Sequence, residues 1–166
     1  MVQLYFTSPL AAAALVKQLK AANIAVELFG TATFLSPQFV EVAGKDAHNA
    51  YFNSGVAPVN AYNGAKVFLD EYKAAYGDTE PGGGAIMGYD AATVVLEAML
   101  GSVRVSGKLP DRSTVERAVR RTRLKNLLSG NVAFNSSGDR RNSVVYILQI
   151  GSDSRPRVSN SRVINR

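Results

Sequence analysis

The order of strand and helix signals in the first third of the chain constrains the fold more than any other feature. Strand-type patterns occur at VQLYF (2–6), AVELFG (25–30) and NAYFNSG (49–55). After the first of them, Ser8 is placed to cap a helix and Pro9 to begin it, and a shorter helical segment ends at Gly44. Strand, helix, strand, short helix and strand in succession predict an α/β fold with a parallel sheet and right-handed crossovers.

Later segments favour helices first and strands at the end. A long helix stops at Gly77, and another apolar helical stripe follows three glycines. Its members are Tyr89, Ala92, Val95, Leu96, Met99, Leu100 and Val103. STVE (113–116) matches a capping box and predicts a helix with arginines on its polar face. Strand patterns occupy 131–135 and 143–151, and a last short strand is expected near Val158.

Composition excludes several kinds of site. The chain is 46% hydrophobic and 19% charged, so it can bury a core, and no apolar run is as long as a membrane span. It has no cysteine, which excludes disulfides, thiolate zinc sites and cysteine nucleophiles. The one histidine, His48, excludes a multi-histidine metal site, and we interpret it as a surface loop residue. We therefore expect neither a metal nor a cofactor.

The net charge of +6 is concentrated in the second half of the chain. The basic residues there include Arg117, Arg120, Arg121, Arg123, Lys125, Arg140, Arg141, Arg155, Arg157, Arg162 and Arg166. Basic surfaces can bind nucleic acids, but no aromatic residues interleave with these arginines. We favour a solvated helix face and a basic tail, and expect no nucleic-acid partner. A nucleic-acid-binding module remains a third hypothesis, which predicts submicromolar, salt-dependent binding.

The glycines at 82–84 do not match a phosphate-binding loop. The sequence from Gly82 is GGGAIMG, in which the last glycine is one place late for a dinucleotide fingerprint, and a helix rather than a strand precedes it. The Walker pattern also fails, because no Lys-Ser/Thr pair follows. Paired carboxylates such as Asp70 and Glu71 lie on a polar helix face, and no nucleophile elbow is present. The sequence therefore predicts that the protein is not an enzyme.

Four stretches, taken in order, resemble the C-terminal half of the branched-chain amino acid type of periplasmic binding protein (type I, Leu-Ile-Val-binding protein-like), the solute-binding component of ABC transporters. They are ALVKQLKAANIAVELFG (14–30), SPQFVEVAGKDAHNAYF (36–52), GYDAATVVLEAM (88–99) and SGNVAFNSSGDRRNSVVYILQI (129–150). The resemblance runs over nearly all of 1–150 and leaves out the basic tail.

The resemblance implies two α/β lobes joined by three crossings, with a ligand held between the lobes. This chain would be a fragment that contains a parallel-sheet lobe and a C-terminal β-hairpin. Its expected parts are the later part of ligand-binding lobe 2 (1–80), a hinge crossing (81–84), helices of lobe 1 (85–128), strands that return toward lobe 2 (129–151) and a basic tail (152–166). The hinge comprises Pro81, Gly82, Gly83 and Gly84, because glycines tolerate the backbone changes of a closing motion. A plain flexible loop is the alternative for these four residues.

Ligand contacts are expected at the carboxyl ends of the parallel strands. In the family that the chain resembles, an acidic residue that pairs with the ligand's ammonium group stands at the position of Ala32. An aromatic residue often stands at the position of Ser8. A buried ammonium without a counter-charge is costly, which makes a branched-chain amino acid doubtful. Hydroxyls at Thr7, Ser8, Thr31 and Thr33 suit a neutral polar or anionic solute instead, although Ser8 can be only a helix cap and the threonines only strand ends. Tyr89 is a further candidate, or packs in the core.

The leading hypothesis is a fragment of an extracytoplasmic solute-binding protein that captures a small polar solute and delivers it to an ABC permease. The alternative is the ligand-sensing domain of a receptor or regulator, because one fold serves several functions. Localisation would be periplasmic or on the extracellular face. The opening residues show no signal peptide, and a strand at residue one leads us to expect that the natural chain continues upstream. We also expect the fragment to form a homo-oligomer, with domain swapping as one form, because apolar faces lack their usual cover.

Overall fold

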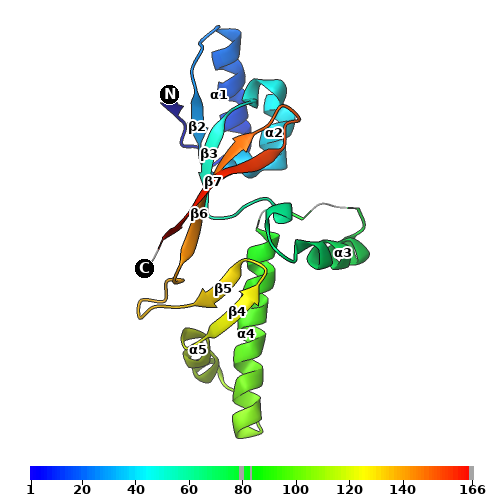
Figure 1. Cartoon of the computed structure of the whole chain (residues 1–166), viewed down its shortest axis with the longest axis vertical. Helices are drawn as coiled ribbons and strands as arrows, with labels where there is room; N and C mark the ends of the chain where they lie inside the picture. Colours follow the sequence, from blue (N-terminus) through cyan, green and yellow to red (C-terminus); the bar gives the residue numbers. More distant parts are fainter. Residues whose placement is uncertain (79–80, 83, 165–166) are drawn as a thin grey trace. The chain divides into compact units, whose positions relative to one another are not determined.

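The computed structural model describes residues 1–78, 81–82 and 84–164. It contains two compact units (Figure 1). The first is Met1–Ala61 with Val144–Val163, and the second is Tyr62–Ser143 with the residues from Ile164 onward.

The first unit is built on a five-stranded sheet. The strands are β1 (Val2–Gln3), β2 (Leu28–Gly30), β3 (Tyr51–Ser54), β6 (Ser143–Ile150) and β7 (Pro156–Ile164), in the order β1-β2-β3-β6-β7. The pairs β1/β2 and β2/β3 are parallel, whereas β6 runs antiparallel to β3, with Phe52 opposite Leu148. The predicted α/β fold with a parallel-rich sheet is confirmed.

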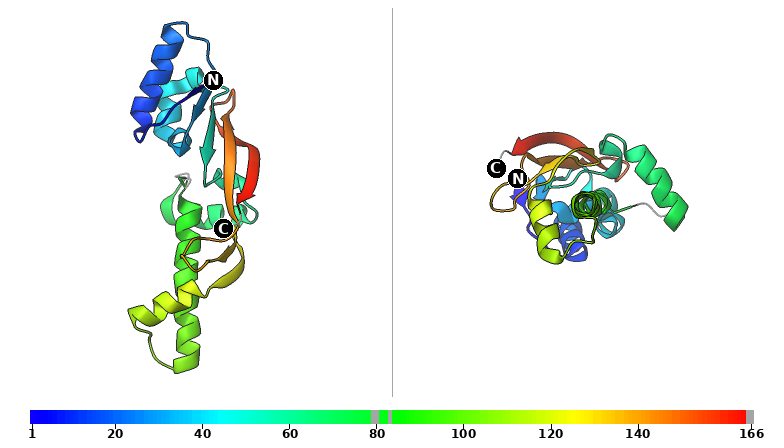
Figure 2. Two further views of the ribbon diagram at one scale, coloured as in Figure 1. Left: turned by 90° about the vertical axis from the view of Figure 1, so that its left-hand side faces the viewer. Right: turned by 90° about the horizontal axis from the view of Figure 1, so that it is seen from below.

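Short helices connect the parallel strands and lie over one face of this sheet (Figure 2). They are α1 (Pro9–Ala21), α2 (Pro37–Ala43) and the 3-10 turns η1 (Ala32–Leu35) and η2 (Gly44–Ala47). As predicted, Ser8 caps α1: its hydroxyl oxygen accepts from the backbone N–H of Ala11 at 3.4 Å, and Pro9 is the first helical residue. The residues of α1 that are buried are Ala12, Ala13 and Val16.

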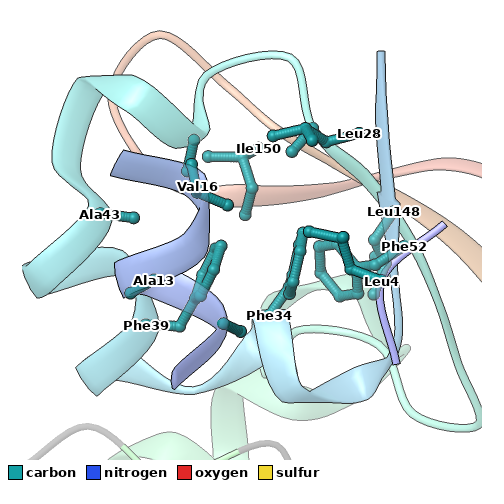
Figure 3. Close-up of a cluster of buried hydrophobic side chains, with 13 residues drawn as sticks. Leu4, Ala13, Val16, Leu28, Phe34, Phe39, Ala43, Phe52, Leu148 and Ile150 are labelled. Atoms are coloured by element: carbon teal, nitrogen blue, oxygen red, sulfur yellow. The ribbon is translucent and has the colours of Figure 1, made fainter. Parts of the chain in front are cut away.

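The core of the first unit lies between these helices and the sheet (Figure 3). Its largest fully buried side chains are Phe34, Phe39, Phe52, Leu148, Ile150 and Val16. The rings of Phe34 and Phe39 stack with their centroids 4.0 Å apart. Removing large side chains of this kind from water is the main favourable contribution to folding.

The C-terminal segment belongs to the sheet of the first unit. The predicted short strand near Val158 is the nine-residue strand β7, next to β6 in the sheet, so most of the expected basic tail is a strand. The chain turns between β6 and β7, where the N–H of Gly151 donates to the carbonyl of Arg155 at 3.0 Å. His48 is half-buried, with its Nε2 3.1 Å from the Ser154 hydroxyl oxygen in this turn. It was interpreted as a surface loop residue, and it lies in a turn and is partly exposed.

The second unit combines three helices with a two-stranded sheet. Its elements are α3 (Ala65–Tyr76), α4 (Ala85–Ser106), α5 (Arg112–Arg120), β4 (Arg123–Leu127) and β5 (Gly130–Ala133). The 3-10 turn η3 (Val59–Ala61) ends the first unit just before it. The cap of α5 differs from the predicted capping box: Asp111, not Ser113, is the N-cap, and its carboxylate accepts from Thr114 N at 2.8 Å.

The strand β4 was not predicted, since the whole range 85–128 had been assigned to helices. It pairs antiparallel with β5, Leu124 opposite Val132, so β5 does not pair with β6. Beyond β5 an antiparallel bridge between Phe134 and Arg140 closes a turn. Pairing with β5 overrides the weak local preference of this segment.

The helix α4 buries a different face from the predicted apolar stripe. The buried residues are Ile86, Asp90, Val94 and Ala98. Tyr89, Leu96 and Leu100 from the predicted stripe are 47%, 58% and 47% exposed. By length and composition alone α4 could cross a membrane, a test that buried core helices also pass. The open stripe agrees with the expectation that some apolar faces of this chain lack a cover.

The compact units divide the chain at other positions than the expected lobes. The ring of Phe68 on α3 meets Tyr89 on α4 with centroids 5.4 Å apart, so α3 belongs with α4 in the second unit. The expected boundary at 81–84 lies within that unit, and Gly83 falls outside the described residues. The division into lobes and a hinge stays a prediction.

Candidate functional site

The candidate site is the edge of the first unit where the parallel strands end. Because β1, β2 and β3 run in the same direction, the segments that follow them leave the sheet at one edge. These segments include 6–8 after β1 and 31–33 after β2. Five of the six predicted ligand contacts lie in them.

Two threonines connect these segments. The hydroxyl of Thr33 donates to the backbone carbonyl of Phe6 at 2.6 Å, and Thr31 Oγ1 lies 3.0 Å from Thr33 Oγ1. Both threonines are half-buried. The short Thr33–Phe6 hydrogen bond brings together the segments that follow β1 and β2, so these polar side chains belong to one local surface.

Thr7, Ser8 and Ala32 are exposed on the same two segments. Ser8 acts as the N-cap of α1, so the structural role considered for it is confirmed. Ala32 has no polar side-chain atom, and neither 6–8 nor 31–33 contains a carboxylate. These two segments therefore offer hydroxyl groups and peptide groups to a solute, and no side-chain counter-charge for an ammonium group.

Tyr89 lies in the second unit. It is 47% exposed on α4 and makes the edge-on ring contact with Phe68. The predicted hinge directly precedes this helix. The N–H of Ala85 donates to the carbonyl of Gly82 at 2.9 Å, and the N–H of Gly88 donates to the carbonyl of Gly84 at 3.0 Å. Pro81 is buried. A role in ligand binding or hinge motion stays a prediction for all of them.

A buried acid in the second unit was missed by the sequence analysis. Asp90 is 4% exposed, and its carboxylate accepts from the backbone N–H groups of Leu128 at 3.1 Å and Ser129 at 2.7 Å. It attaches the turn between β4 and β5 to α4. A signal was present, because Asp90 shares one helical stripe with Ile86 and Val94.

Arg140 holds the other side of this turn. Its guanidinium donates to the hydroxyl and the carbonyl of Ser129 at 2.8 and 2.9 Å, and to the carbonyl of Asn131 at 3.0 Å. Asp90 and Arg140 together therefore satisfy most of the polar groups of the turn. We assign both residues a structural role, because each is committed to backbone groups.

A shallow groove of about 990 Å³ lies between α4 and α5, wholly within the second unit. Val105 and Leu109 line it and are 91% and 84% exposed, and Arg117 and Arg121 lie on its α5 side. Nothing in this groove resembles a group of catalytic residues. Among the described residues, no three His, Asp or Glu side chains come together in a way that could hold a metal ion.

The sequence matches a known family model over most of its length. The model is described as periplasmic binding protein and matches residues 2–155. Among proteins with curated annotation, none matches this sequence.

Solved structures share the fold. A leucine-binding protein from Thermotoga maritima is 25% identical, with a TM-score of 0.75 over 98% of this chain and 44% of its own. A branched-chain amino acid transporter substrate-binding protein from Streptococcus pneumoniae, solved in complex with isoleucine, is 22% identical, with a TM-score of 0.75 over 99% of this chain and 44% of its own. A solute-binding protein of an ABC transporter from R. palustris, in complex with benzoate, is 17% identical, with a TM-score of 0.72 over 99% and 44%. This chain thus spans less than half the length of these structures.

Proposed function

The chain belongs to the periplasmic binding protein family, and from this premise we propose that it is part of an extracytoplasmic protein that holds a small polar solute between two lobes and delivers it to an ABC permease. The family and the similar structures support a solute-binding role without chemistry. Members of the family work in the periplasm or on the extracellular face, and we propose the same location here.

The edge formed by 6–8 and 31–33 is the observation that carries this proposal. Two segments that follow parallel strands are held together by the Thr33–Phe6 hydrogen bond and present further hydroxyl groups beside it. Ligands of open α/β sheets bind at this edge. Selectivity would come from hydrogen bonds, because no catalytic group is present in these segments.

The similar structures hold different kinds of solute, so they do not name the one for this protein. One is in complex with isoleucine and another with benzoate. At Ala32 this chain lacks the carboxylate that would favour an ammonium group. We propose a neutral polar solute.

A thermal-shift screen tests the proposed function. The protein to use is one of the relatives' length that carries this sequence, with the 166-residue chain as the control. We expect one class of solute to raise the melting temperature of the longer protein and to leave that of the shorter chain unchanged, because stabilisation follows affinity for the folded state. If no solute of any class stabilises the longer protein, the proposal is wrong. If the longer protein binds a solute and also carries a signalling domain, the sensing function replaces delivery of the solute to a permease.

We also propose that this chain forms a homo-oligomer through the open stripe of α4, defined by Tyr89, Leu96 and Leu100. A contiguous apolar surface on a helix favours pairing with another surface in water. Exchange of elements between copies is one form that such an oligomer can take. Static light scattering that shows only a monomer at micromolar concentration would contradict this.

A further inference from the structure

The hydroxyl groups of Thr31 and Thr33 form a hydrogen-bonded chain with a defined direction. The Thr33 hydroxyl donates its proton to Phe6 O at 2.6 Å. A threonine hydroxyl has one proton only, so Thr33 has none left for Thr31. In the 3.0 Å contact between the two side chains, Thr31 must therefore be the donor. The direction is Thr31 to Thr33 to the carbonyl of Phe6.

This direction determines what Thr31 can offer to a solute. Its proton is committed to Thr33, so its oxygen retains only lone pairs. Thr31 Oγ1 has no other hydrogen-bond partner among the described residues, and the side chain is half-buried. The opposite direction would leave the carbonyl of Phe6 without this donor, which is unfavourable for a partly buried group.

We propose that Thr31 Oγ1 accepts a hydrogen bond from the solute, so that the solute presents an N–H or O–H group to this edge of the sheet. The inference rests on the proposed solute site and specifies the chemistry that the site selects. An anionic group at this position is excluded, because two acceptors would face each other. The sequence had left an anionic solute open, and the direction of the hydroxyl chain argues against it here.

The residues next to Thr31 limit which kind of hydrogen-bond donor the solute can carry. Ala32 brings no carboxylate, so a bare ammonium would lack a counter-charge, and a neutral donor is favoured. Ser8 uses a lone pair to cap α1 and keeps its proton for an acceptor. The acceptor at Thr31 and the donor at Ser8 lie on the two segments that the Thr33–Phe6 hydrogen bond joins, and they would suit the N–H and the C=O of a carboxamide. The solute class that fits is a neutral, carboxamide-like molecule.

The test uses the whole 166-residue chain with its threonine methyl groups labelled with ¹³C, and follows their NMR signals at millimolar probe concentration, where weak binding to one lobe is visible. The probes are isobutyramide, which has N–H donors, N,N-dimethylisobutyramide, which has none, and the anion isobutyrate. We expect isobutyramide to shift the Thr31 methyl signal with a Kd about three- to tenfold lower than either of the other probes, as one net hydrogen bond implies.

Matched variants test the direction of the chain. Thr33→Val removes the group that takes the Thr31 proton, so Thr31 becomes able to donate, and the preference should reverse toward N,N-dimethylisobutyramide and isobutyrate. Thr33→Ser keeps the hydroxyl and should keep the wild-type preference. Thr31→Val should abolish the preference altogether. If Thr33→Val does not fold, the comparison of the wild type, Thr33→Ser and Thr31→Val still decides the question.

The outcomes separate this inference from the proposed function. If all three probes shift the signals of Thr31 and Thr33 equally, the edge binds solutes but the assigned polarity is wrong. If isobutyrate binds best to the wild type, the polarity is wrong as well. If no probe affects these signals in the 166-residue chain, the inference is overturned, and the thermal-shift screen of the longer protein decides the proposed function separately.

Discussion

Replacing Asp90 with asparagine should loosen the turn between β4 and β5. The Asp90 carboxylate accepts two backbone N–H groups, from Leu128 and Ser129, and is 4% exposed. A hydrogen bond to a charged group contributes about 1.5–3 kcal/mol. Asparagine keeps one carbonyl acceptor but turns an NH₂ group toward the second amide. We therefore expect a loss of about 2 kcal/mol for Asp90→Asn, close to one such hydrogen bond.

Native-state hydrogen exchange measures this loss locally. A change of about 2 kcal/mol corresponds to roughly thirtyfold in an equilibrium constant, so the protection of the Leu128 and Ser129 amides should fall by about that factor. Glu97→Gln is the matched control, since Glu97 is an exposed carboxylate on the same helix. The amides of the first unit serve as an internal reference in the same spectra.

Two results would refute this reasoning. One is a change of less than about threefold at both amides in Asp90→Asn, which would mean that the hydrogen bonds add almost nothing beyond what water provides. The other is an equal loss in Glu97→Gln, which would assign the effect to the charge of α4 rather than to the turn.

Three further predictions follow from single residues. Gly30→Ala would put a Cβ atom 2.6 Å from the buried ring of Phe34 and should cost about 1–3 kcal/mol in urea unfolding, whereas Gly55→Ala, whose Cβ meets nothing within 4 Å, should be nearly neutral. Hydrogen bonds from the first turn of α5 lower the pKa of Asp111, so its capping contribution is complete at neutral pH and is lost as the pH falls through this lowered value. Amide signals of α5 should show this titration in the wild type and not in Asp111→Asn. Leu100→Glu should shift the oligomer toward monomer in light scattering, and an unchanged mass would contradict an interface on α4.

The parallel part of the fold was predictable because its signals are local. Ser8 and Pro9 begin α1 as their chemistry dictates, and the strand patterns at 25–30 and 49–55 contain β2 and β3. The strand β4, which was not predicted, and the strand β7, which is longer than predicted, are rich in polar and charged residues and form beside another strand. Pairing of this kind depends on tertiary structure and leaves no alternation of apolar and polar residues in the sequence.

The place of Thr31 and Thr33 in the fold was predictable from the sequence, but the direction of their hydrogen bonds was not. That Thr31 and Thr33 follow a parallel strand is enough to place them at its carboxyl edge. The direction of their hydrogen bonds depends on the carbonyl of Phe6, 27 residues away from Thr33. No pattern of residue types carries that information. Which face of α4 is buried was also ambiguous in the sequence, because the helix has two stripes that could be buried. The stripe that is buried contains the polar residue Asp90.

The pairing of β3 with β6 has a consequence for the order of events during synthesis. The core needs both Phe52 and Leu148, and a ribosome that adds about 5–20 residues per second takes roughly 5–20 s to pass from one to the other. During that interval β3 has an open edge, whereas the continuous stretch 62–143 is synthesised in full before Leu148 is reached. All of the stretch 62–143 is thus made before the first unit is complete, and a chain truncated after residue 143 and released from the ribosome should hold an ordered second unit and an unfinished first unit.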